Sequence, residues 1–251
     1  MIVRTEAIVL RSIDYGETSE IVTVFTRDMG KLTVMAKGAR RPKSRFGSTL
    51  QPMSYTEVVF YYKETRGIQT LTESSHVRAF HGISRSLEGL SYGLRIVELV
   101  YALMQEEERN PIVFDLVLEI LEELNRTATR LESLFHFFQL RLATVLGFAP
   151  HIEREDVERI PESGGVIALE DGSILPTEPG GAITVRRGSR KALRAFAIFA
   201  RADLETVMRM RVDKRTHIEL SRLIEDFIRY HVEDAYPSRS ARIIGQMLDD
   251  T

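Results

Sequence analysis

Apolar and polar residues alternate over short runs in the first 80 residues, a pattern typical of half-buried β-strands. The runs are rich in valine, isoleucine, threonine, tyrosine and phenylalanine, and turns such as Asp28-Met29-Gly30 separate them. Five strands at this spacing favour a small closed barrel, and the long insertion between the third and the fourth is typical of an OB-fold. The predicted strands span residues 6–10, 19–26, 31–36, 54–62 and 68–73.

After residue 80 the apolar period becomes that of α-helices, as in the row from Leu90 to Met104. We expect the first three helices to form one antiparallel bundle. Two short apolar runs around Asp171-Gly172 predict a β-hairpin. The fold class is therefore α+β, with an N-terminal five-stranded OB-fold barrel followed by a mainly α-helical region with a small β-hairpin insert. The predicted helices lie near 89–104, 111–124, 131–147, 188–202, 203–210, 216–234 and 240–248.

Charge is distributed unevenly, although the formal net charge of the 251 residues is only -2. Residues 1–80 carry 12 basic and 8 acidic residues, residues 81–160 carry 8 and 14, and residues 161–251 carry 14 of each. Such blocks indicate separate surfaces with separate partners, or solvated helix faces that simply differ in sign.

The densest basic stretch, AKGARRPKSRFG at 36–47, lies in the insertion between the third and fourth predicted strands. Its two glycines and its proline keep it out of regular structure, which leaves long side chains free. A phosphate backbone attracts such a cluster through sequence-independent electrostatics. A loop that only improves solubility is the alternative. The basic residues of this stretch are Lys37, Arg40, Arg41, Lys43 and Arg45.

Two further features suit nucleic-acid binding. Tyr15 and Phe46, both predicted in loops, are candidates for stacking on bases. Arg187, Lys191 and Arg194 fall at helical spacing and predict an amphipathic helix with a basic face. This face would extend a DNA path or hold an acidic peptide, and an exposed helix face without a partner explains it equally well.

Motifs for catalysis and metal binding are missing from the sequence. It has no cysteine, which excludes disulfides, thiolate nucleophiles and cysteine-ligated zinc. The six histidines have neither HxH nor HExxH spacing, and we expect His136, inside a predicted helix, to be structural. No secretory leader is visible, and charges interrupt each apolar run well before the length of a membrane span. We expect a cytoplasmic protein that is not an enzyme and uses no metal or cofactor.

Several sequence motifs occur in a fixed order near the N-terminus. They are a first strand ending in VL, YGE before the second strand, FT followed by GK at the next turn, AKGARRPKSR after the third strand, and LQPM before the fourth. Together they resemble the N-terminal OB domain of the RecO family of bacterial recombination mediators. The resemblance continues through SYGLRIVELVYALMQEEE and FQLRLATVLGFAP and weakens in the final third.

The resemblance implies a non-enzymatic DNA repair and recombination protein of the bacterial cytoplasm, associated with the nucleoid. RecO-like proteins bind single- and double-stranded DNA, anneal complementary strands, and bind RecR and single-strand-binding protein. With RecR they help RecA to replace that coating protein. The implied DNA contacts are Lys37, Arg40, Arg41, Lys43 and Arg45, with Arg27 and Lys31 nearby, and the charge pattern adds Arg187, Lys191 and Arg194.

The chain departs from the family pattern because it lacks the cysteines that would bind zinc. Many RecO-like proteins hold zinc with four cysteines after LGFAP, where this chain has HIEREDVERIPESGGVIALEDGSI. Packing must hold the hairpin instead, and His151 with nearby carboxylates is a poor metal site because three or four ligands must converge.

The predicted modules are an OB-fold DNA-binding domain at 1–80, a helical bundle at 81–147, a hairpin module in place of the zinc finger at 148–185, and C-terminal helices packing with the bundle at 186–251.

Two other functions stay open at this stage. A Mg²⁺-dependent nuclease would need carboxylates that converge on one site, and the acidic triplet at 106–108 does not provide them. A non-catalytic OB-fold adaptor would bind RNA or an acidic protein tail, such as that of single-strand-binding protein, through a basic rim and an apolar slot. The candidates for rim and slot are Arg126, Arg130 and Arg141 around Leu131, Phe135 and Phe138.

Overall fold

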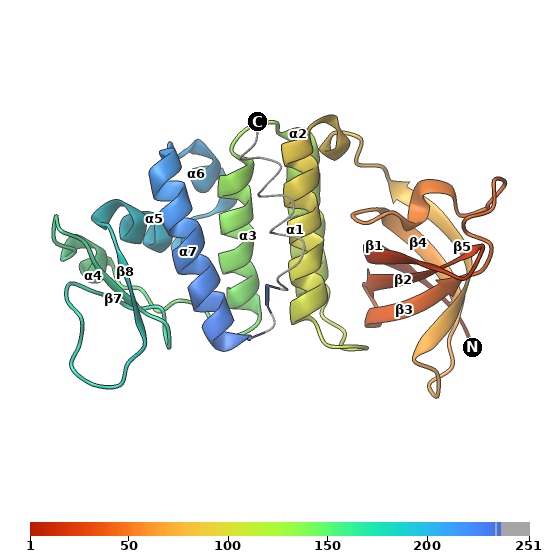
Figure 1. Cartoon of the computed structure of the whole chain (residues 1–251), viewed down its shortest axis with the longest axis horizontal. Coiled ribbons are helices and arrows are strands. Elements are labelled where there is room, and N and C mark those ends of the chain that lie inside the picture. Colours follow the sequence, from red (N-terminus) through yellow and green to blue (C-terminus); the bar gives the residue numbers. More distant parts are fainter. Residues whose placement is uncertain (234, 237–251) are drawn as a thin grey trace. The chain divides into compact units, whose positions relative to one another are not determined.

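The computed structural model describes residues 1–233 and 235–236, which form two compact units, Met1–Ala128 and Thr129–Tyr236 (Figure 1). The first unit contains a β-barrel and two long helices, and the second contains a small sheet and a further set of helices. The helix predicted at 240–248 lies outside the described residues.

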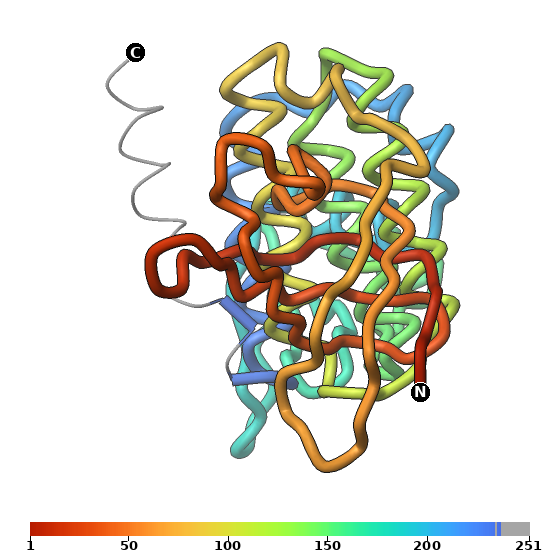
Figure 2. Tube along the Cα trace, turned by 90° about the vertical axis from the view of Figure 1, so that its right-hand side faces the viewer, coloured from red at the N-terminus to blue at the C-terminus, as the bar shows by residue number. Residues whose placement is uncertain are grey.

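Five strands close into a barrel in the order β1-β2-β3-β5-β4, which confirms the predicted OB-fold. The neighbouring strands are antiparallel except for the parallel pair β3 and β5, and Figure 2 shows the long β4–β5 hairpin in orange. The first strand is much longer than predicted and continues past an irregularity between Val9 and Arg11. The strands are β1 (Ile2–Tyr15), β2 (Ser19–Thr26), β3 (Gly30–Ala36), β4 (Tyr55–Tyr61) and β5 (Ile68–Arg78).

The barrel is filled by alternate residues of its strands, such as Val22 and Val24 of β2 and Phe60 of β4. Phe46 and Leu50 join this core from the connection between β3 and β4. Phe46 is only 2% exposed, so the prediction that its ring stacks on nucleic acid is wrong. An aromatic ring in a loop is not exposed to solvent when it packs into the core of the barrel, as Phe46 does.

Two helices complete the first unit, α1 (Leu87–Leu103) and α2 (Pro111–Arg126). The Ser86 hydroxyl caps α1 by accepting the Gly89 N–H, and the Asn110 side chain caps α2 by accepting the Val113 N–H. The first helix contacts β1 and α2. Because the unit ends at Ala128, inside the range 81–147, α1 and α2 share a unit with the barrel. The division into four modules stays a prediction.

In the second unit, α3 packs against α5, α6 and α7. The apolar face predicted for the last described helix is buried, as shown by Leu220, Ile224 and Phe227. The elements of this unit are α3 (Leu131–Val145), α4 (Arg154–Glu158), β6 (Gly165–Ala168), β7 (Ile174–Leu175), β8 (Val185–Gly188), α5 (Arg190–Arg201), α6 (Leu204–Arg209) and α7 (Lys214–His231).

The predicted hairpin around Asp171-Gly172 is confirmed as β6 and β7, and β8 adds a third strand in the order β7-β6-β8. Apolar packing holds this segment, since Ile160, Ile167 and Ile174 are at most 2% exposed. The His151 N–H also donates to the Asp171 carbonyl at 2.7 Å. This hydrogen bond ties the chain entering the segment to the turn of the hairpin.

Replacing Gly30 with alanine tests the tight approach between the β2–β3 turn and the chain before α2. Gly30 has φ +70°, and an added Cβ would overlap the backbone of Glu108. Gly16→Ala is the matched control because its φ is +58° and the space around it is open. We expect Gly16→Ala to cost about 1 kcal/mol of unfolding free energy from backbone strain, and Gly30→Ala about 3 kcal/mol or more. Equal losses in urea unfolding would show that the contact is unimportant.

Candidate nucleic-acid interface

The basic loop, residues 37–45, is a series of turns between β3 and the short helix η1 (Gly47–Leu50). Backbone hydrogen bonds close successive turns, from Arg41 N–H to the Gly38 carbonyl at 3.2 Å and from Ser44 N–H to the Arg41 carbonyl at 2.9 Å. Since Phe46 is buried in the barrel core immediately afterwards, the loop is fixed against the barrel.

The predicted phosphate-binding residues of the basic loop lie together on this connection, and all five are exposed. Arg40 pairs with Asp14 at 3.1 Å, and the Arg45 guanidinium lies 5.1 Å from the centre of the Phe46 ring. The other three have no ion pair with any residue that the structure describes. This leaves net positive charge at the surface, which a phosphate backbone would neutralise. These three are Lys37, Arg41 and Lys43.

The turn between β1 and β2 lies beside the basic loop. The Arg40 N–H donates to the Thr18 carbonyl at 3.0 Å, and its guanidinium reaches the Gly16 carbonyl at 3.3 Å. Tyr15, at the end of β1, is 53% exposed. OB-folds commonly bind oligonucleotides with this turn and the adjacent strands, so Tyr15 stays a stacking candidate while Phe46 does not.

Arg27 is held inside the first unit. Its guanidinium contacts Glu6 at 2.9 Å and Asp115 at 2.7 Å, and it lies 4.7 Å from the centre of the Phe114 ring. Burial alone would lower the pKa of Arg27, but hydrogen bonds to Asp115 and Glu6 outweigh it and raise that pKa. Nearby, burial and then the Glu6 carboxylate raise the pKa of Tyr55 to about 12. Arg27 thus connects the barrel to α2.

Lys31 is likewise engaged within the first unit. It is only 8% exposed, and its ammonium donates to the Tyr101 carbonyl at 2.9 Å and lies 3.6 Å from the Glu106 carboxylate. These contacts connect β3 to the C-terminal end of α1. Arg27 and Lys31 therefore belong to the support of the barrel, separate from the exposed charges of the basic loop.

The second basic block is arranged differently from the prediction. Arg187 lies in β8, so the helix expected to carry all three residues holds only Lys191 and Arg194. The reason is that β6 pairs with β8 as far as Gly188, and the Ser189 side chain then caps α5. Two of the three cations are paired, Arg187 with Glu178 at 3.1 Å and Lys191 with Asp213 at 3.5 Å, and Arg194 is exposed on α5.

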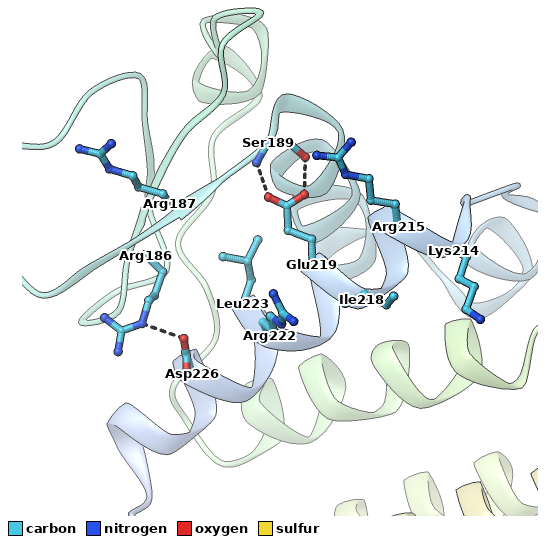
Figure 3. Close-up of a pocket in the computed structure, with 10 residues that line it drawn as sticks. All are labelled: Arg186, Arg187, Ser189, Lys214, Arg215, Ile218, Glu219, Arg222, Leu223 and Asp226. Carbon is cyan, nitrogen blue, oxygen red and sulfur yellow. Dashed lines mark hydrogen bonds and ion pairs between the residues drawn. The ribbon is translucent and has the colours of Figure 1, made fainter. Parts of the chain in front are cut away.

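A basic pocket of about 730 Å³ lies between β8, the start of α5 and α7 (Figure 3). Its acidic members are used internally, since Glu219 accepts the Ser189 N–H at 2.6 Å and Asp226 pairs with Arg186 at 2.7 Å. Ile218 adds an exposed apolar surface. Three cations of the pocket have no ion pair with a described residue, and they are Lys214, Arg215 and Arg222.

Lys214, Arg215 and Arg222 were not among the residues singled out from the sequence. The signal was present, because Lys214, Ile218 and Arg222 are four residues apart and so share one face of α7. The apolar slot proposed at Leu131, Phe135 and Phe138 is wrong, because these side chains are at most 3% exposed and fill the core.

Comparisons with known proteins show which family this chain belongs to. The family profile "Recombination protein O N terminal" matches residues 1–80, and "Recombination protein O C terminal" matches residues 84–240. The chain belongs to the RecO family. It is 53% identical to the DNA repair protein RecO of Salinibacter ruber over 98% of this chain and 94% of that protein. The RecO proteins of Chloroherpeton thalassium and Chlorobium limicola are 32% and 30% identical over at least 99% of both chains.

The family profiles cover both the barrel and the second unit, so the DNA repair assignment applies to nearly the whole chain. The five-stranded barrel and the recombination role expected from the sequence fit this family. Within the described residues, none of the helices has the length and apolar character needed to cross a membrane.

Replacing Arg27 with alanine tests whether this arginine is structural or contacts DNA. We expect the Arg27→Ala variant to lose about 1–2 kcal/mol of unfolding free energy, because two ion pairs and a cation–π contact disappear. The salt dependence of its DNA binding should match that of the wild type. Arg41→Ala, which removes an exposed and unpaired charge, should change stability by less than about 0.5 kcal/mol. Urea unfolding measures the stability of both variants, and fluorescence anisotropy measures the salt dependence of their DNA binding. A changed salt slope for Arg27→Ala would show that Arg27 contacts DNA.

Proposed function

We propose that this protein is a non-enzymatic recombination mediator that binds single- and double-stranded DNA and anneals complementary strands. With RecR it would help to load RecA onto DNA coated by single-strand-binding protein, in the bacterial cytoplasm at the nucleoid. The observation that carries the proposal is the basic loop, where Lys37, Arg41 and Lys43 are exposed and lack ion-pair partners among the described residues. Membership of a DNA repair family supports it.

The proposed mechanism is electrostatic. Two DNA strands repel each other, and a protein that neutralises phosphates on both lowers that repulsion. The basic loop would track one backbone beside Tyr15, with Arg40 and Arg45 at its edges. Lys191 and Arg194 of α5, with Arg187 of β8, would provide a second region of contact. The acidic triplet at 106–108 does not support a nuclease, because Glu106 pairs with Lys31 and Glu107 accepts a hydrogen bond from Tyr62.

The double variant Arg41→Ala/Lys43→Ala tests this proposal. If each side chain neutralises one phosphate, the slope of log K against log salt for single-stranded DNA should become shallower by about 1.4. Annealing of two complementary fluorescent strands at low salt should slow, and the wild-type annealing should persist in EDTA.

The matched control is Arg85→Ala/Arg159→Ala, which removes two exposed arginines far from the basic loop in sequence. It should keep the wild-type slope. If both double variants share the wild-type slope and annealing rate, the basic loop does not bind DNA. If the wild type does not accelerate annealing at all, the mediator function itself fails.

We further propose that the basic pocket receives the acidic C-terminal tail of single-strand-binding protein. Unpaired Lys214, Arg215 and Arg222 would meet carboxylates, and Ile218 would meet an apolar terminal residue. This feature also favours the alternative function, an adaptor that binds an acidic tail or RNA without annealing DNA.

Charge reversal at the basic pocket tests the tail site. Arg215→Glu/Arg222→Glu should weaken binding of a labelled acidic peptide with apolar C-terminal residues by about tenfold or more, if each reversal costs about 0.7–1 kcal/mol. Arg85→Glu/Arg159→Glu should not. Fluorescence anisotropy measures the affinities. Equal peptide affinities for the two variants would show that the acidic tail does not bind in the basic pocket. Peptide binding without DNA binding by the wild type would favour the adaptor.

A further inference from the structure

Two histidines and a glutamate meet between α3 and α7 of the second unit. Glu132 and His136 belong to α3, and His217 belongs to α7. One ligand atom from each side chain lies within 4.8 Å of the other two, and among the described residues this is the one such group of histidine and carboxylate side chains. Imidazole nitrogen and carboxylate oxygen are ligands that zinc accepts.

Local sequence and helix packing create the cluster. Glu132 and His136 are four residues apart, so they lie on the same face of α3. His217 faces them from α7, with its Nδ1 at 3.8 Å from Glu132 Oε2 and its ring centre at 5.4 Å from that of His136. Ligand atoms around a tetrahedral zinc are separated by about 3.4 Å when the bonds are about 2.1 Å long. Small side-chain rotations would therefore close the group around one ion.

The surroundings also suit a metal. His136 is 1% exposed and His217 is 9% exposed, whereas the Glu132 side chain is 32% exposed and leaves access from solvent. The His136 Nε2 lies 2.7 Å from the Ser221 hydroxyl. If that nitrogen donates its proton to Ser221, the other ring nitrogen presents its lone pair, and such outer hydrogen bonds commonly orient metal-binding histidines.

We propose that Glu132, His136 and His217 bind one zinc ion, with water as the fourth ligand, and that this ion cross-links α3 to α7. His136, expected from the sequence to be structural, would then stabilise the packing of α3 against α7 partly as a ligand of the zinc ion. This site is unrelated to the cysteine site of many relatives, since it joins two helices of the second unit and does not involve the segment 148–185.

The test uses the full chain without a histidine tag, stripped with EDTA and then dialysed against zinc. Wild-type protein should retain about one zinc per chain by elemental analysis, and cobalt should give visible d–d absorption bands. Zinc at a hundredfold excess over its Kd should raise the melting temperature by about 5–10 °C.

The variants Glu132→Gln and His217→Gln should abolish stoichiometric zinc binding, the cobalt bands and the thermal shift. His151→Gln removes an exposed histidine outside the cluster and should keep all three. Circular dichroism of the metal-free proteins checks folding, and Glu132→Gln is the decisive variant because the side chain is partly exposed. If the wild type binds no zinc at micromolar concentration, or if Glu132→Gln binds as much as the wild type, Glu132 and His217 form only an ion pair and the proposal fails.

Discussion

The way in which the barrel closes determines where the basic loop can lie. Parallel pairing of β3 with β5, in which Thr33 pairs with Ile68, places β5 next to β3, and β4 pairs with β5 and β1. The chain leaving β3 therefore cannot turn back into a neighbouring strand and must run over the barrel to reach β4. Phe46 and Leu50 enter the core during this crossing and hold the connection in place. The charged residues between β3 and Phe46 are left on the surface.

The same closure separates two kinds of basic residue that the sequence groups together. Arg27 follows β2 and is neutralised by Asp115 of α2. Lys31, the second residue of β3, pairs with Glu106 in the connection between α1 and α2. Lys37 and Arg41, a few residues later, are exposed and have no ion pair with a described residue. A basic stretch thus contributes to stability at its start and presents surface charge at its end.

Apolar packing holds the second unit together. Ile160, Ile167 and Ile174 bury the segment after α3, and α7 carries a buried apolar face. The polar side of α7 contributes three cations of the basic pocket, Lys214, Arg215 and Arg222, while His217 contacts Glu132 of α3. One helix therefore contributes to the core, to a charged surface and to a cluster of metal-ligand type.

The sequence by itself determined the fold class and most of the elements, because alternation, helical periodicity, turns and caps are local signals. The strand predicted at 19–26, the hairpin at Asp171-Gly172 and the family motifs needed no tertiary information. Only the tertiary structure decided which side chains share a surface. Phe46 was drawn into the core, Arg187 was placed in a strand, and residues 85 positions apart, such as His136 and Ser221, met across two helices. Burial and ion pairing depend on long-range contacts, which a local pattern does not contain.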